Sequence, residues 1–298
     1  MNQKGGVGKT TTVINLAACF GALQKRTLLV DMDPQANATS GMGISPLELK
    51  ESIYEVLIES KEITELIRDT AVPFIQLVPS DIRLVGAEIE LVPRNEREKV
   101  LAKALHPVRK DFEFILIDCP PSLGLLTLNA ITAADSVLIP IQCEYYALEG
   151  LSNLLQTIRL VQKSLNNNLK VEGVLLTMYD SRLNLARQVV QEVQAYFRDK
   201  VFRTIIPRNV RLSEAPSHGK SILQFDAASS GALYYKKLAE EILSNGYETS
   251  LAAVHRRSPA INSYLSPTFR TRIGWSTPCS WIDCRKAEIP SGEICSRG

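Results

Sequence analysis

Residues 1–12 of the chain read MNQKGGVGKTTT, and this stretch decides the fold. Its closely spaced glycines allow a tight loop whose backbone N–H groups point inward toward an anion. Lys9 follows the last glycine and places a cation on bound phosphates, and Thr10 offers a hydroxyl to Mg²⁺. The stretch therefore predicts a nucleotide-binding phosphate loop formed by Gly5, Gly6, Val7, Gly8, Lys9, Thr10 and Thr11.

The loop departs from the common motif G-x-x-x-x-G-K-[ST] by one residue, because Gln3 stands where the first glycine belongs. It fits instead the variant K-G-G-x-G-K-[ST], which has a second lysine, Lys4, at the loop entrance. A glycine-rich turn that only caps a helix is the alternative interpretation. Residues 9–23 favour the phosphate loop, because apolar side chains at three- and four-residue spacing predict a helix whose N-terminus can accept phosphates.

Composition indicates a globular protein. The chain has 298 residues, 45% hydrophobic content and a formal net charge of +2, so its global charge says nothing about nucleic acid. No apolar run approaches the roughly eighteen residues that span a bilayer, and a phosphate loop stands where a signal peptide needs an apolar core. We therefore expect a cytoplasmic protein without a membrane partner. The six cysteines form no C-x-x-C pair, which favours reduced thiols.

Apolar runs alternate with helical periodicity along the chain. Strands are predicted over residues 26–31, 74–79, 112–118, 136–141, 170–177 and 201–206, and helices over residues 81–91, 96–109, 122–134, 146–163, 182–198 and 231–244. The strands are continuously hydrophobic, so we predict a doubly wound α/β fold, a mainly parallel sheet with helices on both faces. Too few residues precede Lys4 to form the strand from which the phosphate loop should hang. We expect that the start is assigned too late or that the sequence is truncated, and a substitute strand is the alternative.

The C-terminal part has a different character. Asn245-Gly246 is a helix stop signal, and residues 249–298 contain both tryptophans and four prolines without helical or strand periodicity. We expect one phosphate-loop domain over residues 1–248 and a disordered or non-native extension over residues 249–298. A basic tail that binds DNA or a membrane is the alternative.

Carboxylates end two of the predicted strands. Asp31 and Asp33 follow the run LLV, and Asp118 ends the run FILID. Because the carboxyl ends of parallel strands meet at the edge where ligands bind, these acids should lie near the phosphate loop. Asp33 could hold an attacking water, Asp31 could orient Mg²⁺ or the loop, and Thr10, Asp33 and Asp118 are candidate metal-site residues. A simple turn at Asp33-Pro34 is the alternative.

Several longer stretches resemble the ParA/Soj family of chromosome- and plasmid-partitioning ATPases, of the deviant Walker A type that also includes MinD and the nitrogenase iron protein. They are KGGVGKTTT (4–12), LLVDMDPQANATSG (28–41), GAEIELVP (86–93), IDCPPSLGLLTLNA (117–130), QCEYYALEGL (142–151), VEGVLLTMYDSR (171–182) and IPRNVRLSEAPSHGK (206–220). The matches occur in order and extend over residues 1–246.

The resemblance implies roles for single residues. Lys4 would reach across a homodimer to the ATP of the other subunit, in a role comparable to an arginine finger. Lys9 and Thr10 would bind the β- and γ-phosphates and Mg²⁺. Asp33 would position the hydrolytic water, and Asp118 would support the metal.

Residues 182–220 are rich in arginine and lysine. By itself such a segment is usually a solvated face. The resemblance implies that Arg182 and Arg211 bind DNA phosphates without regard to base sequence, and that a dimer doubles this basic surface. It also implies that Pro207 and Asn209 lie beside the adenine.

Other members of the superfamily fit less well. MinD-like membrane cycling needs a basic amphipathic C-terminal helix, whereas residues 231–246 mix lysines with glutamates. Iron–sulfur chemistry needs cysteines that bridge a dimer, and neither Cys119 nor Cys143 has a second matched ligand. We therefore predict that both cysteines are buried small hydrophobes.

The resemblance thus implies a nucleotide switch associated with the nucleoid. ATP would favour a homodimer that binds double-stranded DNA non-specifically, and weak ATP hydrolysis, stimulated by a ParB-like centromere-binding protein, would release it. The role would be chromosome or plasmid partitioning, or control of replication initiation. A truncated or frameshifted non-enzymatic remnant of such an ATPase, or a MinD-like positioning ATPase, is the alternative.

Overall fold

The computed structural model describes residues 5–144 and 149–257. The predictions for Lys4 and for most of the C-terminal extension lie outside these residues. The chain divides into two compact units, Met1–Asn245 and Gly246–Gly298. The elements considered below belong to the first unit, apart from the last residues of the helix Ser230–Arg257.

Two sets of paired strands form the centre of the first unit. The strands are β1 (Thr27–Asp31), β2 (Arg68–Asp69), β3 (Ile75–Val78), β4 (Phe114–Asp118), β5 (Ser136–Gln142) and β6 (Lys170–Thr177). One sheet has the order β2-β3-β1-β4 with only the edge strand β2 antiparallel, and β5 pairs in parallel with β6. The described strands β4 and β5 share no ladder, but Leu116 and Leu138 pack against the same hydrophobic cluster.

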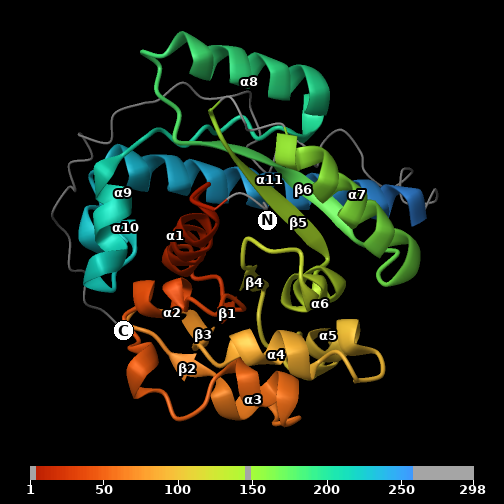
Figure 1. Ribbon diagram of the computed structural model, residues 1–298. Helices are drawn as coiled ribbons and strands as arrows, with labels where there is room; N and C mark the ends of the chain where they lie inside the picture. Colours follow the sequence, from red (N-terminus) through yellow and green to blue (C-terminus); the bar gives the residue numbers. More distant parts are fainter. Residues whose placement is uncertain (1–4, 145–148, 258–298) are drawn as a thin grey trace, which may run out of the picture. The chain divides into compact units, whose positions relative to one another are not determined.

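Helices surround these strands (Figure 1). They are α1 (Lys9–Ala22), α2 (Asn37–Gly41), α3 (Ile53–Ile58), α4 (Leu84–Glu90), α5 (Val100–Leu105), α6 (Leu125–Ala133), α7 (Glu149–Ser164), α8 (Asn184–Phe197), α9 (Val210–Glu214), α10 (Ile222–Phe225) and α11 (Ser230–Arg257). Alternate residues of β1 point to opposite faces. Leu28 and Val30 pack in a cluster with α3–α6, whereas Leu29 packs with α1 and α2. The predicted α/β fold, with helices on both faces of a mainly parallel sheet, is therefore confirmed.

Helix α1 is buried on its predicted apolar face and also at other positions, among them Asn15 and Cys19. Leu16, Ala17 and Phe20 are buried as expected, although Leu23, just beyond the helix, is 44% exposed. Phe20 stacks on Phe114 of β4 with a centroid distance of 4.0 Å, and α11 packs over the same cluster. The phosphate loop thus precedes a helix that the core fixes in place.

The predicted strand over residues 201–206 is wrong. This segment runs beside β6, and the Phe202 and Ile206 N–H groups donate to the Val174 and Leu176 carbonyls, but its pairing is limited to an isolated bridge between Val174 and Val201. The carboxylate of Glu241 on α11 accepts the backbone N–H groups of Arg203 (2.7 Å) and Thr204 (3.0 Å). These two donors are therefore unavailable for a strand ladder.

The helix stop predicted at Asn245-Gly246 is also wrong, because α11 extends to Arg257. A glycine inside a helix costs only about 1 kcal/mol relative to alanine, so it does not end a helix by itself. The sequence interpretation also missed α2, α3, α9 and α10. Each has only four to six residues, too few to show helical periodicity.

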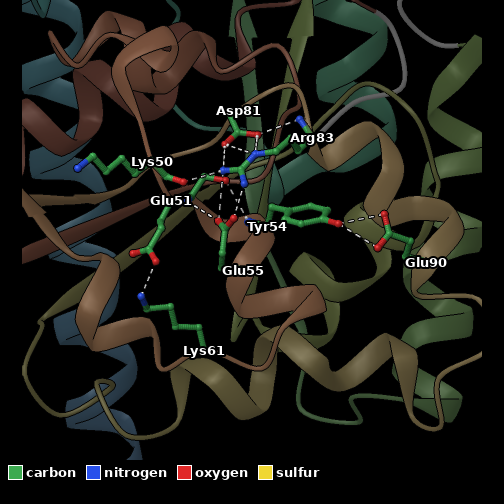
Figure 2. A network of polar contacts seen from close by, with 9 residues as sticks. Lys50, Glu51, Tyr54, Glu55, Lys61, Asp81, Arg83 and Glu90 are labelled. Carbon is green, nitrogen blue, oxygen red and sulfur yellow. Dashed lines mark hydrogen bonds and ion pairs between the residues drawn. The ribbon is translucent and has the colours of Figure 1, made fainter.

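A buried polar network secures α3 against α4 (Figure 2). Ser52 and Glu55 form a capping box at the start of α3. Arg83 forms ion pairs with Glu55 and with Asp81, the latter at 2.6 Å, and these carboxylates raise the pKa of its guanidinium. The Glu55 and Asp81 carboxylates are buried whereas Arg83 is partly exposed, and buried charges are stabilising only when paired, which explains why the three side chains occur together.

The buried hydroxyl of Thr132 contrasts with this network, because it makes no hydrogen bond to the described residues. Thr132 on α6 is buried, and its Oγ1 has no hydrogen-bond partner among the described residues. The substitution Thr132→Val keeps the shape and removes the unsatisfied group, so it should raise the free energy of unfolding by about 1 kcal/mol. Chemical denaturation of both proteins measures the difference, and a less stable variant would contradict the assignment.

Candidate functional site

The phosphate loop has the backbone conformation that its glycines allow. Gly6 and Gly8 have φ angles of +74° and +87°, in the left-handed region that favours glycine. Gly8 is the residue before α1, and its carbonyl accepts the Thr12 N–H at 2.9 Å. A Cβ added to Gly5 or Gly6 would meet no atom of the described residues within 4 Å, which leaves room for a ligand beside the loop.

Two distant residues hold this loop and its helix. The Thr177 hydroxyl at the end of β6 donates to the carbonyl of buried Val7 at 2.9 Å and also lies 3.2 Å from the Ile141 carbonyl. The Tyr235 hydroxyl on α11 lies 3.1 Å from the Thr12 hydroxyl. Sequence reasoning missed both residues, since neither belongs to a recognisable local motif.

The predicted acids meet at one edge of the sheet. β1 and β4 pair in parallel with Asp31 opposite Asp118, which puts both carboxylates at the carboxyl ends of adjacent strands. Asp118 is only 1% exposed. Its Oδ1 accepts the Cys119 N–H at 3.1 Å, whereas its Oδ2 is buried without a hydrogen-bond partner among the described residues.

Electrostatics show that the phosphate loop and the acids form one site. Burial raises the pKa of Asp118 to about 6 and the Asp33 carboxylate adds to this, while Thr10 and the Lys9 ammonium oppose it. Burial lowers the pKa of Lys9, and the negative charges of Asp118 and Asp33 oppose that shift. The structure therefore brings together four of the residues that the sequence proposed for phosphate and metal binding, Lys9, Thr10, Asp33 and Asp118.

The donor set suits a divalent cation with mostly external ligands. Among the described residues, no group of three or more histidine, cysteine or carboxylate side chains is arranged to hold a metal ion. Mg²⁺ usually takes only one or two protein ligands and completes its shell with water and phosphate oxygens. The unpartnered Oδ2 of Asp118 and the nearby Thr10 hydroxyl fit that requirement.

The segment after β1 makes a turn as well as carrying an acid. The backbone carbonyl of Asp33 accepts the Ala36 N–H at 2.9 Å, and its Oδ1 accepts the Gln35 N–H at 2.9 Å. Asp31 is more deeply enclosed. Burial and the Asp118 charge raise its pKa to about 7, while hydrogen bonds from Thr39 act in the opposite direction. The turn and the acidic site are thus compatible.

One of the predicted adenine residues, Pro207, lies near the end of β6 in space, although it is far from it in sequence. Pro207 forms an isolated bridge with Tyr179, two residues beyond Thr177. Asn209 caps α9, because its Oδ1 accepts the Arg211 N–H at 2.8 Å, and its Nδ2 donates to Ser230 Oγ at 2.8 Å.

The two predicted DNA-binding arginines are exposed but paired. Arg182 is 85% exposed at its side chain and contacts Asp180 through Nε (2.9 Å) and Nη2 (2.7 Å). Arg211 pairs with Glu214 at 3.0 Å on the first turns of α9. Each arginine therefore has an acidic neighbour that competes with any phosphate.

The two internal cysteines are buried, as predicted, and burial raises the pKa of both Cys119 and Cys143 to about 12. Neutral thiols at ordinary pH are poor nucleophiles and poor metal ligands. Within the described part of the chain, no helix combines the length and apolarity needed to cross a bilayer.

Comparison with known proteins gives consistent results. Residues 1–171 match a family model described as an AAA domain. The chain is 59% identical over 245 residues to the sporulation initiation inhibitor protein Soj of Bacillus subtilis. This match covers 82% of this chain and 97% of that protein. It is 57% identical over 242 residues to the chromosome partitioning protein ParA of Myxococcus xanthus, with 81% and 86% coverage.

Among solved structures, cobyrinic acid a,c-diamide synthase from Mycobacterium smegmatis, with bound ADP and magnesium, matches with a TM-score of 0.72 at 40% identity. The match covers 82% of this chain and 91% of that one. These similarities extend over most of each protein, and they agree with a phosphate loop and acids at one edge of a mainly parallel sheet. The chain therefore belongs to the ParA/Soj family of chromosome-partitioning proteins.

Proposed function

We propose that this protein is an ATP-dependent switch in chromosome or plasmid partitioning. ATP and Mg²⁺ bind at the phosphate loop and favour a homodimer, and the dimer binds double-stranded DNA without sequence preference. Slow hydrolysis, stimulated by a ParB-like protein, returns the chain to the monomer. Such a protein works in the cytoplasm at the nucleoid. Control of replication initiation is a further possible use of the same cycle.

The observation that carries the proposal is the grouping of Lys9, Thr10, Asp33 and Asp118, with one oxygen of Asp118 buried and unpartnered. Bound Mg²⁺ would neutralise charge on the β- and γ-phosphate oxygens. Lys9 would bind the same phosphates, and Thr10 and Asp118 would hold the metal directly or through water. Asp33, with its carboxylate fixed by the Gln35 N–H, would orient the attacking water.

The remaining assignments come from the family. Lys4 would act in trans on the nucleotide of the second subunit, and Pro207 and Asn209 would face the adenine. The similarity of the chain to Soj and ParA over most of its length supports these roles. ATP can shift a monomer–dimer equilibrium only through contacts made in one of the two states, and Lys4 would supply one.

A binding and turnover experiment tests the proposal. The protein should bind Mg-ATP and hydrolyse it slowly, and DNA together with a ParB-like protein should accelerate turnover.

The matched variant Asp118→Asn should lose the thermal stabilisation by Mg-ATP. Because the pKa of Asp118 is raised in the folded state, its ionisation destabilises the fold as pH rises, so at pH 8 the nucleotide-free variant should melt about 2–4 °C higher. A wild-type protein that binds no nucleotide would exclude the ATPase and favour a non-enzymatic remnant.

Removal of the second lysine separates binding from dimerisation. Lys4→Ala should leave nucleotide binding by the monomer within about threefold of wild type, because Lys9 and the loop backbone remain. It should abolish ATP-dependent dimerisation and hydrolysis, since the trans contact is lost. Light scattering with and without Mg-ATP measures the oligomeric state. An ATP-dependent dimer of the Lys4→Ala protein would contradict the trans role.

Two substitutions, expected to change DNA affinity in opposite directions, test the proposed DNA surface. Arg182→Ala should weaken DNA binding at every sequence and reduce the salt dependence of log K by about one per subunit. Asp180→Asn removes the competing acid and should strengthen binding by about two- to fivefold, the size expected for an exposed ion pair. Binding isotherms on random-sequence duplexes at several salt concentrations provide the measurement. Unchanged affinity in both variants would place the DNA surface elsewhere.

A further inference from the structure

We propose that the buried hydroxyls of Thr39 and Ser80 are positioning groups, which hold the loop that carries Asp33 in its working geometry. Thr39 lies on α2, and Ser80 follows β3. The inference rests on the proposed function and deepens it, because it names residues outside the predicted site on which hydrolysis depends.

A continuous chain of hydrogen bonds links these residues. The Thr39 hydroxyl donates to Asp31 Oδ2 at 2.7 Å, and the Thr39 N–H donates to the same oxygen at 2.8 Å. The Thr39 hydroxyl in turn accepts the Ser80 N–H at 2.9 Å. The Ser80 hydroxyl donates to the backbone carbonyl of Asp33 at 2.6 Å. Asp31, Thr39 and Ser80 have no exposed surface, so water cannot replace these bonds.

The chain fixes the backbone on both sides of Asp33. The Asp33 N–H donates to Asp31 Oδ1 at 3.1 Å. The Asp33 carbonyl accepts hydrogen bonds from the Ser80 hydroxyl and from the Ala36 N–H. With both peptide groups held, the direction in which the Asp33 side chain leaves the backbone is set. The position of a water-orienting carboxylate is sensitive to errors of about 1 Å, so such fixing affects rate.

The loop also contains a strained residue. Ala36 has φ +51°, in the left-handed region that residues with a Cβ avoid, and it is buried. Such conformations persist only where the surrounding structure imposes them. Ser40 holds the Ala36 carbonyl locally, and the bonds from Thr39 and Ser80 add the restraint that joins the loop to the ends of β1 and β3. Their loss should let the turn relax.

Three variants isolate the hydroxyls. Thr39→Val removes the hydroxyl and keeps the shape, Thr39→Ser keeps the hydroxyl and removes only a methyl group, and Ser80→Ala breaks the other end of the chain. Thr132→Val is the matched control, because it makes the same change at a buried threonine whose hydroxyl has no partner among the described residues. A purely packing role for Thr39 would damage Thr39→Ser more than Thr39→Val.

The first readout needs no nucleotide. In hydrogen–deuterium exchange of the nucleotide-free protein, Thr39→Val and Ser80→Ala should accelerate exchange in peptides covering residues 31–41 by about tenfold or more, with peptides of α8 unchanged. Thr39→Ser and Thr132→Val should exchange like wild type. This measurement remains valid even if the protein does not hydrolyse ATP, which would refute the proposed function separately.

The second readout is single-turnover hydrolysis of Mg-ATP. Thr39→Val and Ser80→Ala should reduce the rate constant by about ten- to a hundredfold, while the dissociation constant for ATP changes by less than about threefold. Thr39→Ser should restore the rate. Wild-type rates in Thr39→Val and Ser80→Ala, or equal damage in Thr39→Ser and Thr39→Val, would overturn the proposal. If Thr39→Val does not fold, Ser80→Ala decides by the same criteria.

Discussion

The crowding of negative charge where β1 and β4 end is the constraint on which the rest of the structure depends. Parallel pairing puts Asp31 beside Asp118, and both are buried. Carboxylates so close together, away from water, repel one another and favour protonation unless cations or donors neutralise them. The Lys9 ammonium and the N-terminal end of α1 supply part of that positive potential. The unneutralised remainder makes this edge attractive to a metal cation.

The same residue type serves two purposes at this edge. Both oxygens of Asp31 accept hydrogen bonds, from the Asp33 N–H and from Thr39, so its capacity is used within the fold. Asp118 accepts one bond from its neighbouring N–H and keeps Oδ2 without a partner in the described structure. Burial is similar in the two cases, and the difference lies in the donors that other elements bring. Asp31 therefore organises the loop, whereas Asp118 remains able to bind an external ligand.

This difference marks the limit of what the sequence could predict. Asp31 and Asp118 end similar apolar runs, so pattern alone gave them similar roles, and it predicted the phosphate loop and the main strands because those signals are local. The partners that fix the site are remote. Thr177 reaches Val7 across 170 positions and Ser80 reaches Asp33 across 47. A single hydroxyl at a strand end leaves no periodic signal in the sequence. In the same way, the sequence does not show that Glu241, from a helix far along the chain, accepts the backbone N–H groups of residues 203 and 204.

Gly43 and Gly219 form a backbone contact between the end of α2 and the arginine- and lysine-rich segment 182–220. The 3₁₀ helix η6 (Ala215–His218) follows α9 and ends at Gly219, which lies against Gly43 just after α2. A Cβ on Gly219 would come within 2.9 Å of the Gly43 Cα, so the two backbones touch without side chains between them. Thr39 bonds α2 to Asp31, so the acidic loop, α2 and the segment bearing Arg211 are in continuous contact. The proposed coupling of nucleotide hydrolysis to DNA binding needs two sites that bias one shared element, and this series of contacts joins the acidic loop to the segment that bears Arg211.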